Sequence, residues 1–192
     1  MKIGFLGAGK MAEAILASLV QSDLCAPWEV MACDKAQERR ALMEKQYGVI
    51  VTDDVAQTVK ACQVLVLAVK PQNLAELLGE IKKLLTDKHL LISIAAGKTL
   101  AALKQAAGAK PRIVRVMPNL ALRVQEGMSV FCMAKNAKAA DKQRVVQIFG
   151  SAGSVLEMGE KHFDAVTALS GSGPAFFAYM MQAMAEGAVA LG

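Results

Sequence analysis

A chain of 192 residues is long enough to bury a hydrophobic core and short enough to form one domain, or one domain and part of a second. Apolar residues make up 54% of the chain and charged residues 20%, which excludes an intrinsically disordered protein. The net charge of +5 suits an anionic ligand, but the basic residues are scattered without interleaved aromatic residues. Composition therefore argues against nucleic acid as a partner.

Apolar strand patterns alternate with helical patterns over the first 160 residues. The first strand is predicted at residues 2–6, and a glycine-rich turn then leads into a helical pattern over residues 11–24. Further strands are predicted at 29–33, 49–51, 64–69, 90–94, 113–116, 128–133 and 154–157, and further helices at 37–47, 54–60, 73–85, 100–106 and 139–149. This alternation predicts an α/β fold, a Rossmann-type doubly wound parallel sheet with helices on both faces.

The composition changes near residue 160, where the strand patterns stop and a helical sequence rich in Ala, Gly and Met begins. We therefore predict a Rossmann dinucleotide-binding domain over residues 1–160 and the beginning of an all-helical domain over residues 161–192. The helical pattern reaches Gly192 without a stop signal, so we expect a truncated or naturally short form. Residues 174–192 are apolar but include Gln182 and Glu186, which favours a buried or interfacial helix over a membrane span.

The cysteines and histidines lack the spacing of metal ligands. The four cysteines form no CxxC pair, and only His89 and His162 could join them. We predict no metal site and expect reduced, packed thiols in a cytoplasmic protein. No signal peptide pattern precedes the first strand, which agrees with that location.

Residues 2–12 carry the most informative motif, Lys-Ile-Gly-Phe-Leu-Gly-Ala-Gly-Lys-Met-Ala. A strand, a tight turn and a helix start in this order are typical of a dinucleotide-binding βαβ unit. Gly7 allows the sharp turn, Gly9 allows the backbone to approach a pyrophosphate, and Ala12 lets the helix pack on the strand. The pyrophosphate would then lie on amide groups at the positive end of the helix. The motif predicts NADH or NADPH as the cofactor.

Asp34 ends the second predicted strand, about 22 residues after Ala12, where a carboxylate commonly binds the ribose hydroxyls. This carboxylate would repel the 2′-phosphate of NADPH. Lys35, Arg39 and Arg40 lie close in sequence and could offset the repulsion. The residues favour NADH and leave NADPH open.

Four further motifs follow predicted strands or open the helical region. They are Val69-Lys70-Pro71-Gln72, Ser93-Ile94-Ala95-Ala96-Gly97, Arg115-Val116-Met117-Pro118-Asn119 and Ala168-Leu169-Ser170-Gly171-Ser172-Gly173-Pro174-Ala175. With the glycine-rich motif, this set resembles the pyrroline-5-carboxylate reductase family over essentially the whole chain. The resemblance implies a Rossmann domain followed by a helical domain that dimerises, and so a homodimer or higher homo-oligomer formed through the C-terminal helices.

The resemblance also implies roles for individual residues. The cofactor-binding residues would be Gly7, Ala8, Gly9, Lys10, Met11, Ala68, Val69, Lys70, Pro71, Ile94, Ala95, Ala96, Gly97 and Asn119, to which the argument from the second strand adds Asp34. The substrate-binding residues would be Glu160, Ser172 and Gly173. Simpler interpretations remain open: Lys70 as a solvated strand-end lysine, Glu160 as an ordinary loop carboxylate, and residues 170–174 as a helix cap and turn. No general acid is assigned.

The reaction implied by the resemblance is hydride transfer from NADH or NADPH to the C=N carbon of 1-pyrroline-5-carboxylate, a small imino acid, giving L-proline. The sequence departs from the family in three ways. Asp34 stands where members often have Ser, Asn or Arg, and Leu120-Ala121-Leu122 stands where they usually have Thr-Pro or a close variant. The chain also ends before a later substrate-binding loop. One alternative is a ferredoxin-like or flavin-type electron carrier, whose iron–sulfur form is disfavoured because the cysteines are not clustered. Two further alternatives remain. One is another Rossmann oxidoreductase, such as a β-hydroxyacid dehydrogenase, although no lysine follows Lys161 to activate its substrate. The other is a truncated, non-catalytic dinucleotide-binding module.

Overall fold

The structure, a computed structural model, describes residues 1–192 and contains one eight-stranded sheet in the order β3-β2-β1-β4-β5-β6-β7-β8. The strands are β1 (Ile3–Leu6), β2 (Val30–Cys33), β3 (Ile50–Thr52), β4 (Val64–Leu67), β5 (Leu90–Ser93), β6 (Arg112–Met117), β7 (Gly127–Met133) and β8 (Gly153–Glu157). The strand order reverses between β1 and β4, which are paired in parallel. A doubly wound sheet binds its ligand at such a reversal, beside the carboxyl ends of the strands.

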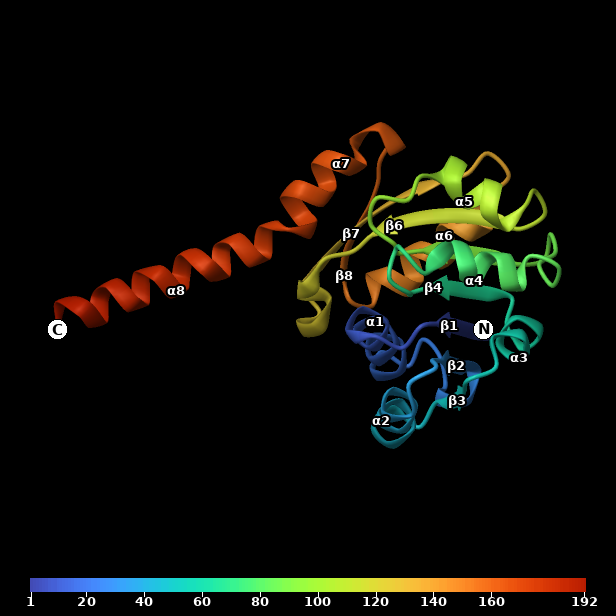
Figure 1. Cartoon of the computed structure of the whole chain (residues 1–192), viewed down its shortest axis with the longest axis horizontal. Coiled ribbons are helices and arrows are strands. Elements are labelled where there is room, and N and C mark those ends of the chain that lie inside the picture. The colour runs from blue at the N-terminus through green and yellow to red at the C-terminus, as the bar shows by residue number, and fades with distance from the viewer.

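Helices cover both faces of the sheet (Figure 1). They are α1 (Lys10–Gln21), α2 (Gln37–Tyr47), α3 (Val55–Ala61), α4 (Leu74–Ile81), α5 (Leu100–Ala107) and α6 (Ala139–Gly150). One hydrophobic cluster joins α1, α2 and α6 to one face, and a second joins α3, α4 and α5 to the other. Both faces of β1, β4 and β5 are buried, as is typical of parallel strands covered by helices on both sides. The predicted Rossmann architecture is confirmed.

The expectation of an all-parallel sheet is wrong at β7, which runs antiparallel to β6 with Arg115 opposite Cys132. The connection between the two strands contains only a short 3-10 turn, Leu120–Val124. A parallel crossover needs about a dozen residues or more and usually a helix, so this shorter connection returns the chain antiparallel. Helix α6 then provides the crossover that places β8 parallel to β7.

Local signals placed several element ends correctly. Asp54 caps α3 by accepting a hydrogen bond from the Gln57 amide at 3.0 Å, and Gly48 closes α2 in the left-handed conformation with φ +67°. Several boundaries differ from prediction, among them those of β2 and α4. Glu29 belongs to a 3-10 turn that begins at Pro27, so β2 starts at Val30, and α4 ends at Ile81, short of the predicted residue 85.

The chain is helical after β8. A 3-10 turn, Glu160–His162, leads into α7 (Phe163–Val166), a π-helical turn at Thr167–Gly171 and the 19-residue helix α8 (Gly173–Leu191). Helix α8 extends away from the sheet, with its C-terminal end far from the other helices (Figure 1). Gly173 is its only buried residue, and apolar side chains such as Phe177 and Met184 are mostly exposed. No helix has the length and apolar character needed to cross a membrane.

Candidate dinucleotide and substrate site

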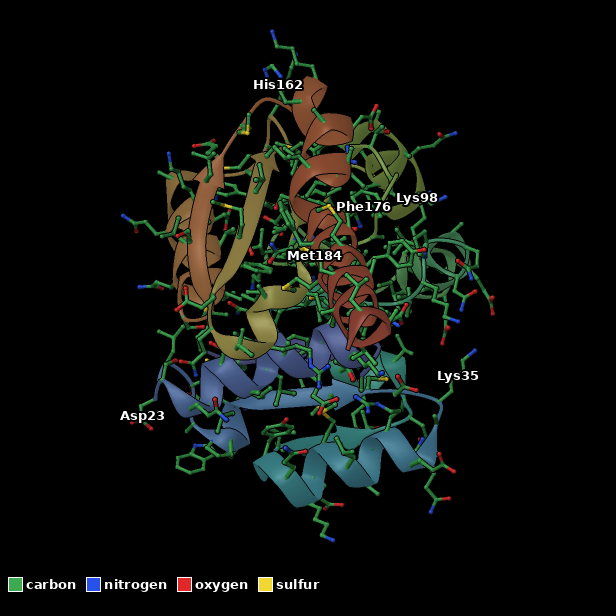
Figure 2. All side chains as sticks on the ribbon, turned by 90° about the vertical axis from the view of Figure 1, so that its left-hand side faces the viewer. Asp23, Lys35, Lys98, His162, Phe176 and Met184 are labelled. Atoms are coloured by element: carbon green, nitrogen blue, oxygen red, sulfur yellow. The ribbon has the colours of Figure 1, made fainter.

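A cleft of about 450 Å³ opens where β1, β2 and β4 end. Figure 2 views the molecule from the side toward which these strands point, with α8 projecting toward the reader. The cleft is lined by Leu6, Gly7, Gly9, Cys33, Asp34, Lys35, Asp53, Val55, Ala68, Val69, Lys70, Asn73, Glu76, Leu77 and Glu80. It therefore occupies the position at which a doubly wound sheet receives a nucleotide.

The turn after β1 has the geometry that its glycines predicted. Gly7 has φ +101°, and a Cβ at this position would lie 2.8 Å from the backbone of Ala68. Gly9 is the residue before α1, and a Cβ there would have no neighbour within 4 Å. No side chain caps the first turn of α1, so its amide groups face the open space beside Gly9. This arrangement fits a pyrophosphate.

Asp34 connects the glycine-rich turn to the end of β2. Its Oδ2 accepts a hydrogen bond from the Ala8 amide at 2.7 Å, and its Oδ1 accepts one from the Ala36 amide at 2.9 Å. A carboxylate has about four acceptor positions, so two remain for other donors. Asp34 therefore holds the turn in place and can still accept hydrogen bonds from ribose hydroxyls.

The three cations near Asp34 differ in how they are held. Arg39 donates to the Ala8 carbonyl at 2.7 Å and pairs with Glu13 at 2.6 Å. Arg40 donates to the Asp34 carbonyl at 2.8 Å and lies 3.4 Å from a carboxylate oxygen of Asp53. The side chain of Lys35 is 85% exposed, points outward in Figure 2, and only approaches Glu76 at 4.0 Å. Lys35 is therefore the cation most free to meet a 2′-phosphate.

The other predicted cofactor residues also lie at the carboxyl ends of the parallel strands. Ala68, Val69 and Lys70 line the cleft directly after β4. Pro71 comes next in the chain, and Lys10 and Met11 belong to the first turn of α1. Residues 94–97 directly follow β5 and are not among the residues that line the cleft. Ala8 and Ala95 are buried, and both backbone groups of Ala8 are already bonded to the protein, its amide to Asp34 and its carbonyl to Arg39.

A second group of residues gathers beyond β6. A Cβ on Gly171 would lie 2.6 Å from Cε of Met117, so the π-helical turn packs directly on the end of β6. The Ser172 amide donates to the Thr167 carbonyl at 2.9 Å, and the buried hydroxyl of Ser170 has no hydrogen-bond partner. Asn119 accepts a hydrogen bond from the Met128 amide at 3.1 Å through its side-chain oxygen and so fixes the start of β7. Ser172 is partly buried and Gly173 buried at the start of α8.

Glu160 is engaged with the protein. Its Oε1 accepts hydrogen bonds from the Leu100 amide at 2.6 Å and from Nη1 of Arg115 at 3.1 Å. Arg115 lies on β6 with its side chain 5% exposed, and its guanidinium carbon is 4.4 Å from the centre of the Phe163 ring. In the sequence, Arg115 stands out only as a member of the motif at residues 115–119. The available signal was a charged residue inside a strand that is otherwise apolar.

The cysteines are free and buried. Burial raises the pKa of the Cys62 thiol to about 11, and burial and the nearby Glu160 carboxylate raise the pKa of the Cys132 thiol to about 12. These thiols are therefore protonated at neutral pH and poor nucleophiles. No group of three or more His, Cys, Asp or Glu side chains is arranged to hold a metal ion.

A Rossmann sheet whose glycine-rich turn opens into a cleft at the strand reversal is the arrangement of dinucleotide-binding proteins, a class that includes the NAD(P)-dependent oxidoreductases. Comparison with known families agrees with this class: residues 2–97 match the family described as "NADP oxidoreductase coenzyme F420-dependent", and residues 160–192 match "Pyrroline-5-carboxylate reductase dimerisation". The chain belongs to the pyrroline-5-carboxylate reductase family. The relatives that establish this are 30–40% identical, and they match nearly all of this chain and about 70% of their own length.

A pyrroline-5-carboxylate reductase from Methanosarcina acetivorans is 40% identical over 98% of this chain and 70% of its own length. One from Arabidopsis thaliana is 38% identical over 100% of this chain and 69% of its own length. A solved structure of Plasmodium falciparum pyrroline carboxylate reductase with NADP bound is 30% identical, with a TM-score of 0.91 over 100% of this chain and 70% of that one. The family predicted from the motif set is thereby confirmed.

Proposed function

We propose that this chain reduces 1-pyrroline-5-carboxylate to L-proline with NADH or NADPH. The proposal is supported most directly by the packing of Gly171 on Met117. This contact brings the turn at residues 170–174 to the edge of the sheet at which the glycine-rich turn opens. A ring bound there would lie beside a nicotinamide that extends from the cleft along this edge.

The bound nicotinamide supplies the hydride. The first turn of α1 and Gly9 hold the pyrophosphate, Asp34 holds the adenosine ribose, and residues 68–71 and 94–97 guide the cofactor along the strand ends. Met117 and Asn119 lie where the nicotinamide would end. These residues correspond to the cofactor-binding set that the motifs predicted.

The imino acid needs little chemical activation, because a protonated C=N group is already a strong electrophile. The chain's task is then to orient the ring against the cofactor and to exclude water. Ser172 and Gly173 form the substrate end in this proposal, and Ser170 adds a buried hydroxyl that lacks a partner. A boundary near residue 160 separates the cofactor domain from the helical domain that carries these residues.

Helix α8 supplies the surface for association with a second copy. Its exposed apolar residues include Phe176, Phe177, Met180 and Met184, and Figure 2 shows Phe176 and Met184 on the projecting helix. An uncovered apolar surface of this extent is typical of an interaction site. The match of residues 160–192 to a dimerisation family supports a homo-oligomer formed through this helix.

The test is cofactor oxidation by the purified chain. NADH or NADPH is mixed with 1-pyrroline-5-carboxylate, and loss of the reduced nicotinamide absorbance is followed. Gly9→Trp is the matched control, because a Cβ at this position meets no neighbour within 4 Å and the indole would fill the open space beside α1 that is proposed for the pyrophosphate. We expect turnover that Gly9→Trp abolishes. Cofactor binding without turnover would refute the proposal and identify a dinucleotide-binding module.

A further inference from the structure

Arg115 is an unusual residue for its position. It occupies the middle of β6, next to Val114 and Val116, and pairs with Ser93 on β5 and Cys132 on β7. A charged side chain buried in the middle of a sheet is costly unless it is paired and hydrogen-bonded. Its partner is Glu160, and the Phe163 ring covers the guanidinium group. The ion pair therefore lies between the sheet and the first turns of the helical region.

The Glu160 carboxylate joins three segments through one oxygen. It is itself the first residue of the helical region, it bonds Arg115 on β6, and it bonds the amide of Leu100, the first residue of α5. Leu100 directly follows residues 94–99, which contain the predicted cofactor-binding residues 94–97. The chain beyond Glu160 leads within a dozen residues to Ser172. One residue thus connects the predicted cofactor side and the predicted substrate side of the site.

Capping of α5 does not account for the bond to Leu100. Thr99 is the N-cap of α5, and its hydroxyl oxygen already accepts a hydrogen bond from the Ala102 amide at 3.2 Å. A side chain from 60 residues further along the chain adds a second acceptor at the same helix end. The additional bond restrains where the α5 end lies relative to β6 and the 3-10 turn at Glu160.

We propose that Arg115 and Glu160 form a positioning pair that sets the distance between residues 94–99 and the turn at residues 170–173. The expected effect on the KM rests on the proposed function. The expected restraint of residues 94–99 and 170–173 does not depend on it. Glu160 acts through Leu100 and Arg115, in place of a direct bond to the substrate. Arg115 acts by holding Glu160 on the sheet while Phe163 packs over it.

The test compares Glu160→Ala, Glu160→Gln and Arg115→Lys with the control Glu157→Ala. Glu157 forms an ion pair with Lys142 at 2.6 Å, but both side chains are about half exposed and neither touches residues 94–100. Backbone amide exchange is measured on each full chain, and the KM for 1-pyrroline-5-carboxylate and the Kd for NADH are measured separately. Exchange reports local opening whether or not the chain turns over.

For Glu160→Ala we expect exchange to accelerate at residues 100–102 and 167–173, with α1 to α3 unchanged. The KM for the imino acid should rise about 10- to 100-fold, because small misplacements of the reacting groups have effects of this size, while the Kd for NADH changes only a few-fold. Glu160→Gln keeps an oxygen acceptor but removes the charge opposite the buried Arg115, so its loss of protection and its rise in KM should lie between those of Glu160→Ala and the parent chain. Arg115→Lys should resemble Glu160→Ala in weaker form, and Glu157→Ala should resemble the parent chain.

Two results would overturn the proposal. Unchanged exchange at residues 100–102 and 167–173 in Glu160→Ala would show that the pair restrains neither segment. Accelerated exchange throughout the sheet, with equal losses in KM and Kd, would show a role in general stability only. A parent chain without turnover would refute the proposed function alone, because the exchange pattern would still decide the role of the pair.

Discussion

Asp34→Asn tests how the cleft distinguishes the two nicotinamide cofactors. In the folded chain both oxygens of Asp34 accept backbone amides, at 2.7 Å from Ala8 and 2.9 Å from Ala36, which fixes the carboxylate at the mouth of the cleft. A carboxylate hydrogen-bonded to a ribose lies about 3 Å from the 2′ oxygen. A 2′-phosphate in the same place would lie roughly 4 Å from the carboxylate charge.

The size of the effect follows from that separation. Two unit charges 4 Å apart interact with about 1 kcal/mol in bulk water and about 4 kcal/mol at the effective dielectric constant near a protein surface. Asp34 is half-buried, and Lys35 nearby is exposed and carries the opposite charge, so we take about 1–3 kcal/mol for this cleft. Removal of the charge should lower the ratio of the NADPH Kd to the NADH Kd by about 5- to 150-fold.

Calorimetric titration of Asp34→Asn with NADH and with NADPH measures this ratio without requiring turnover. The substitution also costs one of the two amide hydrogen bonds, since the amide nitrogen of Asn cannot accept, and this weakens the glycine-rich turn. Both cofactors share that turn, so its loss cancels in the ratio. Asp53→Asn is the matched control, because Asp53 lines the same cleft but is mostly exposed and pairs with Arg40. An unchanged ratio in Asp34→Asn, or an equal change in Asp53→Asn, would refute the reasoning.

Three further outcomes can be stated from the geometry. Gly7→Ala should destabilise the chain by about 2 kcal/mol or more, because φ is +101° and a Cβ would touch the backbone. Gly9→Ala should instead leave the melting temperature unchanged and weaken cofactor binding. Equal melting temperatures for the two variants would contradict this expectation. The pKa of the Cys132 thiol is raised to about 12 in the folded chain, whereas the same thiol in the unfolded chain releases its proton near pH 8.5. The contribution of Cys132 to the free energy of unfolding should therefore be constant below about pH 8.5 and decrease as the pH rises toward 12. Urea unfolding across that window should show a shallower fall in Cys132→Ala, and an identical slope would count against the assignment. Replacing Phe177 and Met184, which are 65% and 75% exposed, with serine should shift sedimentation toward the monomer, while an unchanged oligomer would place the interface elsewhere.

The cofactor half of the site was predictable because its parts are close in sequence. The turn, the space beside Gly9 and the start of α1 all arise within residues 7–12, so local rules are sufficient to describe them. Asp34 was predicted at the end of β2, and the structure places it there. Its bond to the Ala8 amide was not predicted, because it depends on how two parallel strands align in register.

The reversal of β7 shows a different limit of sequence patterns. The apolar run at residues 128–133 predicts a strand correctly, but a strand pattern carries no direction. Direction comes from the connection, which here contains a short 3-10 turn in place of a crossover helix. The absence of a helical pattern between residues 117 and 127 was the signal that a parallel arrangement was unfavourable.

The substrate half depends on contacts between distant segments, and Arg115 illustrates why a pattern could not specify them. In the sequence, Arg115 looks like an interruption of an apolar strand, and Glu160 looks like a loop carboxylate 45 residues later. Without Glu160, the buried guanidinium of Arg115 would be unpaired and therefore unfavourable. Without Arg115, an exposed Glu160 side chain would have no fixed geometry. Together with Phe163 they bring the first helical turns onto the end of the sheet that holds the cofactor cleft. The burial of Arg115 is therefore the property that joins a cofactor-binding sheet to a substrate-binding turn, and it exists only once both segments are folded.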